Sequence, residues 1–245
     1  NQYGSWGHWA YTQQSQYFLI QSISVFGMGY ITFLITWFAS VINWAFENRR
    51  DWGSVKRGVL VYSLVFGLTF IYGAYRVQFQ KANSETIRVA SISALDDLRK
   101  FDVDFEGLKE NVPSNAAKVS FRENVAKLNQ DLIDKSIKEA NAGAKIVFWA
   151  EANGQILKED ETQFYKEASK VAAQHNIYLG LGIAVLDPNS ENPVENKFVL
   201  FDHKGEKVID YWKNITVPGV ERETSLEHRN GIFRTESPYG TIAAA

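Results

Sequence analysis

The sequence contains no cysteine, which excludes a disulfide-stabilised fold, a thiolate metal site and a cysteine nucleophile among these 245 residues. Only four histidines occur, and none of them shows the spacing of a metal ligand set: His8, His175, His203 and His228. Phosphate-loop, dinucleotide-binding and Gly-x-Ser-x-Gly motifs are also absent. We therefore expect no metal and no other cofactor.

Charge is distributed unevenly along the chain. No Asp, Glu, Lys or Arg precedes Glu47, and residues 1–81 hold six basic and two acidic side chains, a balance of +4. Residues 82–245 hold twenty basic and twenty-six acidic side chains, a balance of −6. We interpret residues 1–81 as a membrane region and residues 82–245 as an acidic soluble domain. No large basic patch indicates a nucleic-acid partner.

Two apolar runs in the first region are long enough to cross a bilayer, which takes about 20 residues. They cover residues 17–46, without one formal charge, and residues 58–75. The short loop between them carries Arg49, Arg50, Lys56 and Arg57, which predicts that the loop is cytoplasmic and that both outer flanks are outside. The alternative is a pair of buried helices in a soluble protein, which the polar side chains of the first run leave open.

The second region predicts an α/β domain. Strands are expected at 86–95, 145–150 and 177–186, separated by helices that begin at the capping box Ser120–Glu123 and at about residue 160. Residues 196–202 and 207–212 predict a hairpin, residues 96–118 and 214–238 irregular segments, and residues 241–245 the start of another strand. This order predicts a mixed sheet with helices covering one face. The sequence begins without Met and stops within an apolar strand, so we expect it to be part of a longer protein.

Three side chains are candidates for chemistry. Glu151 directly follows the apolar strand 145–150, and Lys213 ends the strand 207–212. Strand ends are where α/β enzymes place reacting groups, so a carboxylate there can act as a base and a lysine can stabilise an oxyanion. Glu221 follows eight residues after Lys213 and can orient it. Taken alone, the local sequence around Glu151 and Lys213 favours ordinary polar residues that end a strand, and Glu221 can equally be one more loop acid.

These segments resemble the carbon–nitrogen hydrolase (nitrilase) superfamily, which carries Glu, Lys and Cys on three strand ends. Ile146-Val-Phe-Trp-Ala-Glu151 is similar to its Glu segment, with Ala150 in place of the usual Pro. Tyr211-Trp-Lys213, followed by Val217-Pro218-Gly-Val-Glu221, is similar to its Lys segment, with Gly219-Val220 in place of Phe-Gly. Asn196 and the strand after it match the region before that lysine. Tyr239-Gly240-Thr-Ile-Ala-Ala-Ala245 resembles the opening of the Cys strand, so the resemblance places the nucleophile just beyond Ala245.

Membrane spans before such a domain, and the segment Gly4–Gln13, resemble the apolipoprotein N-acyltransferase family. The resemblance implies membrane α-helices followed by an α/β (α+β) nitrilase-like sandwich domain, truncated at its carboxyl end. It implies a multi-pass protein of the cell inner membrane with an extracytoplasmic catalytic domain. Glu151 would be the general base, Lys213 the oxyanion stabiliser, and Glu221 a group that holds Lys213 or positions the amine.

The implied reaction moves an acyl chain from a phospholipid donor to a cysteine thioester and then to the N-terminal amine of a lipoprotein acceptor. Two other functions stay open at this point. One is a membrane-tethered amidase of the same superfamily, in which water resolves the thioester. The other is a non-catalytic membrane protein built on a nitrilase scaffold.

Overall fold

The structure is a computed structural model, and its chain divides into two compact units, Asn1–Glu85 and Thr86–Ala245. Each unit is described by itself. The residues that the structure describes are 7–49, 51–80, 85–94, 115–190, 194–215 and 231–244.

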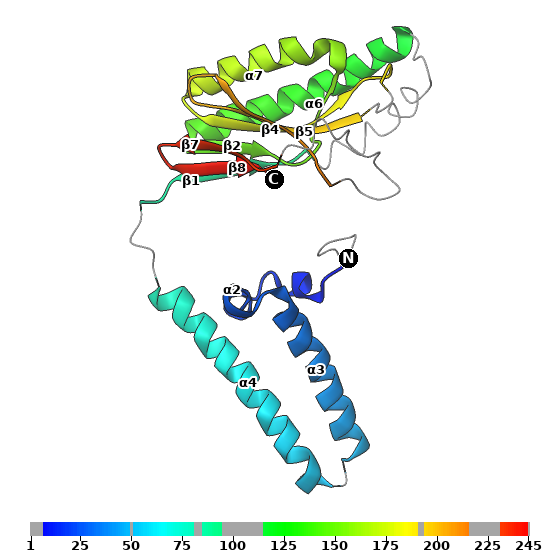
Figure 1. The fold of residues 1–245 in the computed structure, drawn as a ribbon, viewed down its shortest axis with the longest axis vertical. Helices are drawn as coiled ribbons and strands as arrows, with labels where there is room; N and C mark the ends of the chain where they lie inside the picture. The colour runs from blue at the N-terminus through cyan, green and yellow to red at the C-terminus, as the bar shows by residue number, and fades with distance from the viewer. Residues whose placement is uncertain are drawn as a thin grey trace. The chain divides into compact units, whose positions relative to one another are not determined.

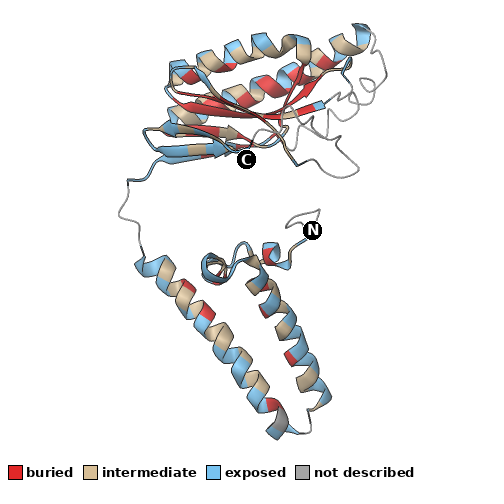
Figure 2. Cartoon of the chain, in the orientation of Figure 1, coloured by how far each residue is buried: buried red, intermediate tan, exposed pale blue. Residues whose placement is uncertain are grey.

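The first unit is built on two long antiparallel helices, α3 (Met28–Glu47) and α4 (Trp52–Phe79) (Figure 1). Within them, Met28–Glu47 and Val55–Phe79 are long and apolar enough to cross a membrane by length and composition. Few of their apolar side chains are buried, and many are exposed, among them Phe33, Leu60 and Leu64 (Figure 2). A small buried cluster around Ile31 and Leu34 joins α3 to the segments before it and to α4.

The expectation of one continuous span over residues 17–46 is wrong. The chain turns at Gly27, whose φ of 71° and ψ of 176° lie outside the helical region and are readily adopted only without a Cβ. Residues before Gly27 form three short helices: η1 (Trp9–Gln13), α1 (Tyr17–Ile20) and α2 (Ile23–Phe26). The predicted span 58–75 lies within α4, which continues to Phe79.

Helix α1 packs closely against the last turns of α4. A Cβ placed on Gly73 would lie 1.7 Å from the carbonyl oxygen of Phe18, so only glycine permits this approach. On the same helix, a Cβ on Gly67 would meet nothing within 4 Å. Gly73 therefore fixes the α1–α2 segment beside the end of α4 that leads toward the second unit.

The second unit contains a mixed six-stranded sheet whose main path is β1-β2-β4-β5-β6, with β3 paired to β4. Pairing is parallel among the first four strands and antiparallel for β4–β5 and β5–β6. The strands are β1 (Arg88–Ile92), β2 (Ala144–Trp149), β3 (Gly154–Leu157), β4 (Tyr178–Leu186), β5 (Val194–Phe201) and β6 (Lys207–Trp212).

The two faces of this sheet are covered differently (Figure 1). Helices α6 (Asn115–Asn141) and α7 (Glu161–His175) lie on one face, where Leu132 and Ala168 pack against Val147 and Leu181. A short helix, η2 (Lys158–Asp160), precedes α7. The antiparallel hairpin β7 (Phe233–Ser237) and β8 (Gly240–Ala244) lies on the other face, against the cluster that includes Leu200 and Ile209. The predicted mixed sheet with helices on one face is therefore observed.

Several boundaries differ from those that the sequence predicted. Helix α6 begins at Asn115, so the capping box at Ser120 is wrong, because the residues Ala-Ala-Lys that precede it favour the helix. Strand β3 was not predicted, since its four residues GQIL carry no alternation. Residues 233–237 are a strand rather than part of a loop. Within the two predicted irregular segments, residues 96–114 and 216–230 lie outside the described residues.

Candidate active site

The structure brings the side chains of Glu151 and Lys213 together. Glu151 lies in the turn after β2, and Lys213 directly follows β6. The Lys213 Nζ donates a hydrogen bond to Glu151 Oε1 at 2.7 Å. Sixty-two residues separate the two positions, so the contact depends on the sheet order that places both strand ends near the same edge. The Glu151 side chain is 61% exposed and the Lys213 side chain 23%, so the lysine is the more enclosed of the two.

Asn196 on β5 is the third member of this group. Its Nδ2 donates to the same Glu151 Oε1, at 2.7 Å. The Lys213 backbone N–H donates to the Asn196 carbonyl at 2.9 Å, which extends the β5–β6 ladder by one pair. Paired residues of neighbouring strands point to the same face, so the sheet register itself directs Asn196 and Lys213 at one carboxylate oxygen.

The backbone that carries Glu151 is fixed by a buried asparagine. Asn153 is 2% exposed; its Oδ1 accepts the Ala94 backbone N–H at 2.5 Å, and its Nδ2 donates to the Glu151 carbonyl at 3.0 Å. Between Glu151 and Asn153, Ala152 has a φ of 53°, an uncommon left-handed conformation for a residue with a side chain. Asn153 thus ties this strained turn to the end of β1.

The turn also depends on the middle of β4. A Cβ on Gly182 would lie 2.2 Å from the Ala150 carbonyl oxygen and 2.9 Å from that of Trp149. Any larger residue there would displace the backbone directly before Glu151. Trp149 is itself anchored, because its Nε1 donates to the buried Ser136 Oγ at 2.8 Å. The base of the turn is consequently rigid while the Glu151 side chain projects from it.

These residues line a cleft of about 300 Å³, with Trp149, Gly182, Phe198 and Tyr211 as its apolar part and Glu151, Asn196 and Lys213 as its polar part. Lys197 also borders the cleft, but its charged end lies on the opposite face of β5. A carboxylate held by an ammonium and an amide, beside apolar walls, can take a proton from a nucleophile. The same ammonium can neutralise a developing oxyanion. Among the described residues, no group of three or more His, Asp or Glu side chains could hold a metal ion.

Of the three side chains that the sequence singled out, Glu151 and Lys213 are thus neighbours, and Glu221 lies outside the described residues. Sequence reasoning placed Asn196 only by its resemblance, and it missed Asn153 and Gly182 altogether. Nothing local distinguishes Asn153, since its importance comes from a hydrogen bond to Ala94, 59 positions away. Gly182 lies in an apolar strand with a second glycine, Gly180, and only the neighbouring turn shows why it is needed.

A compact network of charges lies on the opposite face of β5. Lys197, with a side chain 4% exposed, bonds Glu161 Oε1 at 2.7 Å and Glu195 Oε2 at 2.6 Å. Lys158 bonds the same two carboxylates, at 2.8 and 2.9 Å. The Lys197 Nζ also lies 4.4 Å from the centre of the Trp212 ring, directly across the strand pair. This network fixes the strand segment that carries Asn196 on its other face.

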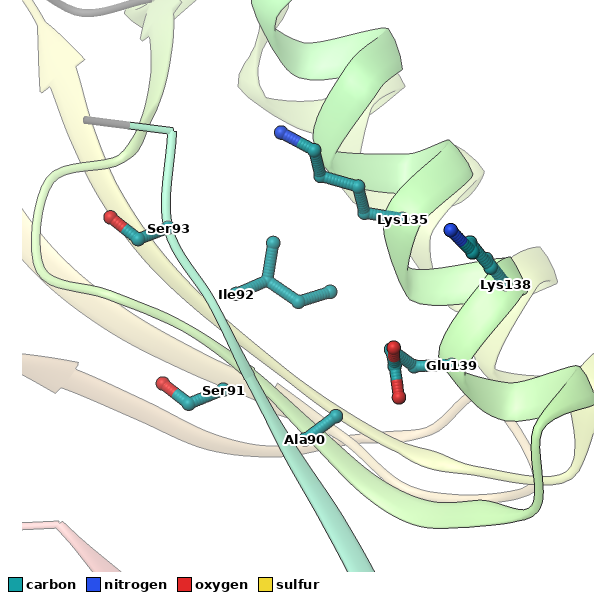
Figure 3. A pocket seen from close by; sticks show the side chains of 7 residues that line it. All are labelled: Ala90, Ser91, Ile92, Ser93, Lys135, Lys138 and Glu139. Carbon is teal, nitrogen blue, oxygen red and sulfur yellow. The ribbon is translucent and has the colours of Figure 1, made fainter. Parts of the chain in front are cut away.

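A second cleft lies beside the end of β1, lined by residues 90–93 and by Lys135, Lys138 and Glu139 of α6 (Figure 3). Its carboxylate, Glu139, is engaged by Arg88 at 2.6 Å. Lys135 is engaged by Asp131 at 2.5 Å. This cleft therefore lacks the convergence of acid, amide and lysine found around Glu151.

No family model and no curated protein matches the chain. Solved structures similar to it include an amidase from Nesterenkonia sp., with 14% identity over 49% of this chain and 48% of that one and a TM-score of 0.41. A carbon–nitrogen hydrolase from Helicobacter pylori G27 is similar with 16% identity over 43% of this chain and 41% of that one, and a TM-score of 0.32. The C. elegans NitFhit protein is similar with 17% identity over 62% of this chain and 35% of that one, and a TM-score of 0.30. The chain spans less than half the length of each of these structures.

Proposed function

We propose that this chain is part of a membrane-bound acyltransferase of the carbon–nitrogen hydrolase superfamily, similar to apolipoprotein N-acyltransferase. The observation that carries the proposal is the contact of Glu151 with Lys213 and Asn196 at the strand ends that the family motifs specify. Glu151 is the general base and Lys213 the oxyanion stabiliser. Glu221 completes the set by holding Lys213 or positioning the amine.

The chemistry proceeds in two steps that regenerate the enzyme. Glu151 takes the proton of a thiol, and the thiolate attacks the ester carbonyl of a phospholipid, giving an oxyanion that Lys213 stabilises. Collapse expels the lysophospholipid alkoxide, which recovers the proton from Glu151 and leaves a thioester. An amine then attacks the thioester and Glu151 accepts its proton. Collapse forms the amide and expels the thiolate, which takes that proton from Glu151 and regenerates the thiol and the carboxylate. The 245 residues contain no cysteine, so this mechanism requires a thiol from outside them.

Two features support lipid substrates and a membrane location. The helices Met28–Glu47 and Val55–Phe79 are long and apolar enough to span a bilayer. Arg49, Lys56 and Arg57 lie at the connection between these helices, which favours a cytoplasmic connection and an extracytoplasmic domain. A base linked to such helices is suited to an acyl donor phospholipid and a lipoprotein acceptor, both of which are confined to the membrane.

The fate of the thioester tests this proposal. The protein that carries both this chain and the thiol is supplied with a radiolabelled phospholipid and a diacylglyceryl peptide with a free amino terminus. We expect the label to move to the peptide as an amide. Release of labelled free acid at the same rate with and without the peptide contradicts acyl transfer and identifies a hydrolase. The 245 residues alone serve as the blank, since they cannot form a thioester.

A further inference from the structure

One basic side chain in the first unit lies apart from the charged connection between its helices. Arg76 lies near the end of α4, and its Nη1 donates to the Ser24 hydroxyl of α2 and, at 3.4 Å, to the Tyr72 hydroxyl. Among the described residues, no carboxylate forms an ion pair with it. A guanidinium held by two neutral hydroxyls keeps its positive charge and further N–H donors for an anion.

The helix length places Arg76 at the depth of lipid headgroups. The apolar segment Val55–Phe79 has 25 residues, or about 37 Å of helix, against a hydrocarbon core of about 30 Å. Arg76 is three residues from the end of that segment. When the charged connection lies at one surface of the bilayer, Arg76 therefore lies at the other, where phosphate groups are concentrated.

The surroundings of Arg76 have the composition of a membrane interface. Tyr17 and Phe26 on the short helices, and Tyr75 and Phe79 on α4, are exposed large aromatic side chains. Aromatic rings are enriched where hydrocarbon meets headgroups, and short amphipathic segments lie flat at that depth. The close approach at Gly73 holds the α1–α2 segment against α4, so Ser24 stays within reach of Arg76.

We propose that Arg76, held by Ser24 and Tyr72, binds the phosphate of a phospholipid at the bilayer surface opposite the charged connection. The bound lipid is positioned at the membrane surface from which the chain continues to the second unit. This inference rests on the proposed membrane function and adds to it a headgroup site for the acyl donor. The group that Arg76 recognises is the singly charged phosphodiester of a phospholipid, rather than free phosphate.

Lipid binding can be measured without acyl transfer. The chain is purified in phospholipid-free detergent micelles and titrated with dioleoylphosphatidylglycerol, and the bound lipid is counted by native mass spectrometry. We expect Arg76→Gln to weaken binding at least tenfold, because a charge-assisted contact of about 1.5–3 kcal/mol is lost. Arg76→Lys should restore part of the affinity. Arg57→Gln removes the same charge from the other end of α4 and should leave binding unchanged.

Two further ligands identify the part of the lipid that is recognised. Dioleoylglycerol has the same acyl chains without the phosphate, and its binding should not differ between the parent chain and Arg76→Gln. Inorganic phosphate at millimolar concentration should not displace the phospholipid. Three results would each overturn the proposal. They are equal phospholipid affinities of Arg76→Gln and Arg57→Gln, loss of dioleoylglycerol binding in Arg76→Gln, and displacement of the phospholipid by inorganic phosphate.

Folding and function are separated by two additional readouts. If circular dichroism shows that Arg76→Gln has lost helix, the Ser24→Ala variant is tested instead. This variant should bind the phospholipid at least threefold more weakly than the parent chain. Unchanged binding by Ser24→Ala then overturns the proposal. These experiments measure no catalysis, so a negative result for lipid binding does not contradict the acyltransferase function. Conversely, phosphate-dependent binding without acyl transfer supports the Arg76 site and contradicts only the acyltransferase function.

Discussion

At the scale of single residues, the position of Glu151 depends on groups that take no part in the proposed chemistry. Asn153 connects the Glu151 carbonyl to the Ala94 N–H, and Gly182 leaves room for the Ala150 carbonyl. Because the turn includes a left-handed alanine, it has little intrinsic preference for its own conformation. The surrounding hydrogen bonds and the absent Cβ therefore keep Glu151 within reach of Lys213.

Replacing Asn153 should affect stability and acyl transfer together. Asn153→Ala leaves a buried Ala94 N–H without its acceptor, a change that costs about 1–3 kcal/mol. It also releases the Glu151 carbonyl, so we expect slower thioester formation at temperatures where the variant is fully folded. Thermal unfolding and the rate of thioester formation measure the two effects. Asn189→Ala, in an exposed turn, is the matched control and should change neither. Full activity of folded Asn153→Ala contradicts the positioning role.

The places of Glu151 and Lys213 after strands were predictable from local sequence, whereas their catalytic roles came only from the resemblance and stay predictions. Their contact was only an expectation, since it depends on the order of strands in the sheet. Asn153 and Gly182 were not predictable, because their roles arise from atoms far away in the chain. Glu221 stays a prediction.

At the scale of elements, the charge network joins the start of α7 to strands β5 and β6. Burial raises the pKa of Glu161, but hydrogen bonds from Lys158, Lys197 and Tyr165 outweigh it and lower that pKa to about 2. A depressed carboxyl pKa stabilises the fold above the unfolded value of about 4.5, and this contribution is lost as the pH falls toward 2. The network is therefore most effective near neutral pH.

The network predicts a specific response to acid. Glu161→Gln should lose about 2 kcal/mol of unfolding free energy at pH 7, because the buried Lys197 and the partly exposed Lys158 each lose a charged partner. Its stability should also fall less steeply between about pH 4.5 and 2 than that of the parent chain. Thermal unfolding followed by circular dichroism across this range measures both. Glu167→Gln, on the exposed side of α7, should keep the parent slope, and an equally steep slope in Glu161→Gln is the contrary result.

Elements with a strong apolar pattern have boundaries close to the predicted ones, whereas short elements were not predicted. Strand β4 is buried at all nine positions and was predicted within a residue, because a continuous apolar run leaves little choice. Helix α7 was predicted to begin at about residue 160, and it begins at Glu161. Strand β3 is too short for a period to appear, and the turn at Gly27 interrupts an apolar run whose composition alone favours one long helix.

At the scale of the whole molecule, the chain combines a pair of long apolar helices with an acidic α+β unit. The composition indicated this division, since basic residues predominate in 1–81 and acidic residues in 82–245. The helices supply the proposed route to lipid substrates, and the second unit supplies the proposed base and oxyanion stabiliser. Both proposals meet in one central claim, that Glu151 and Lys213 act as a unit on an acyl group.

A double-mutant cycle on the rate of thioester formation tests that claim most directly, using the protein that carries both this chain and the thiol. Glu151→Gln and Lys213→Met should each slow the reaction at least a hundredfold, with Lys204→Met as an exposed lysine control that keeps the parent rate. Because groups that act as a unit are not additive, the double variant should be no more than about tenfold slower than the slower single variant. Near-normal rates in either single variant, or losses that multiply in the double variant, would contradict the account.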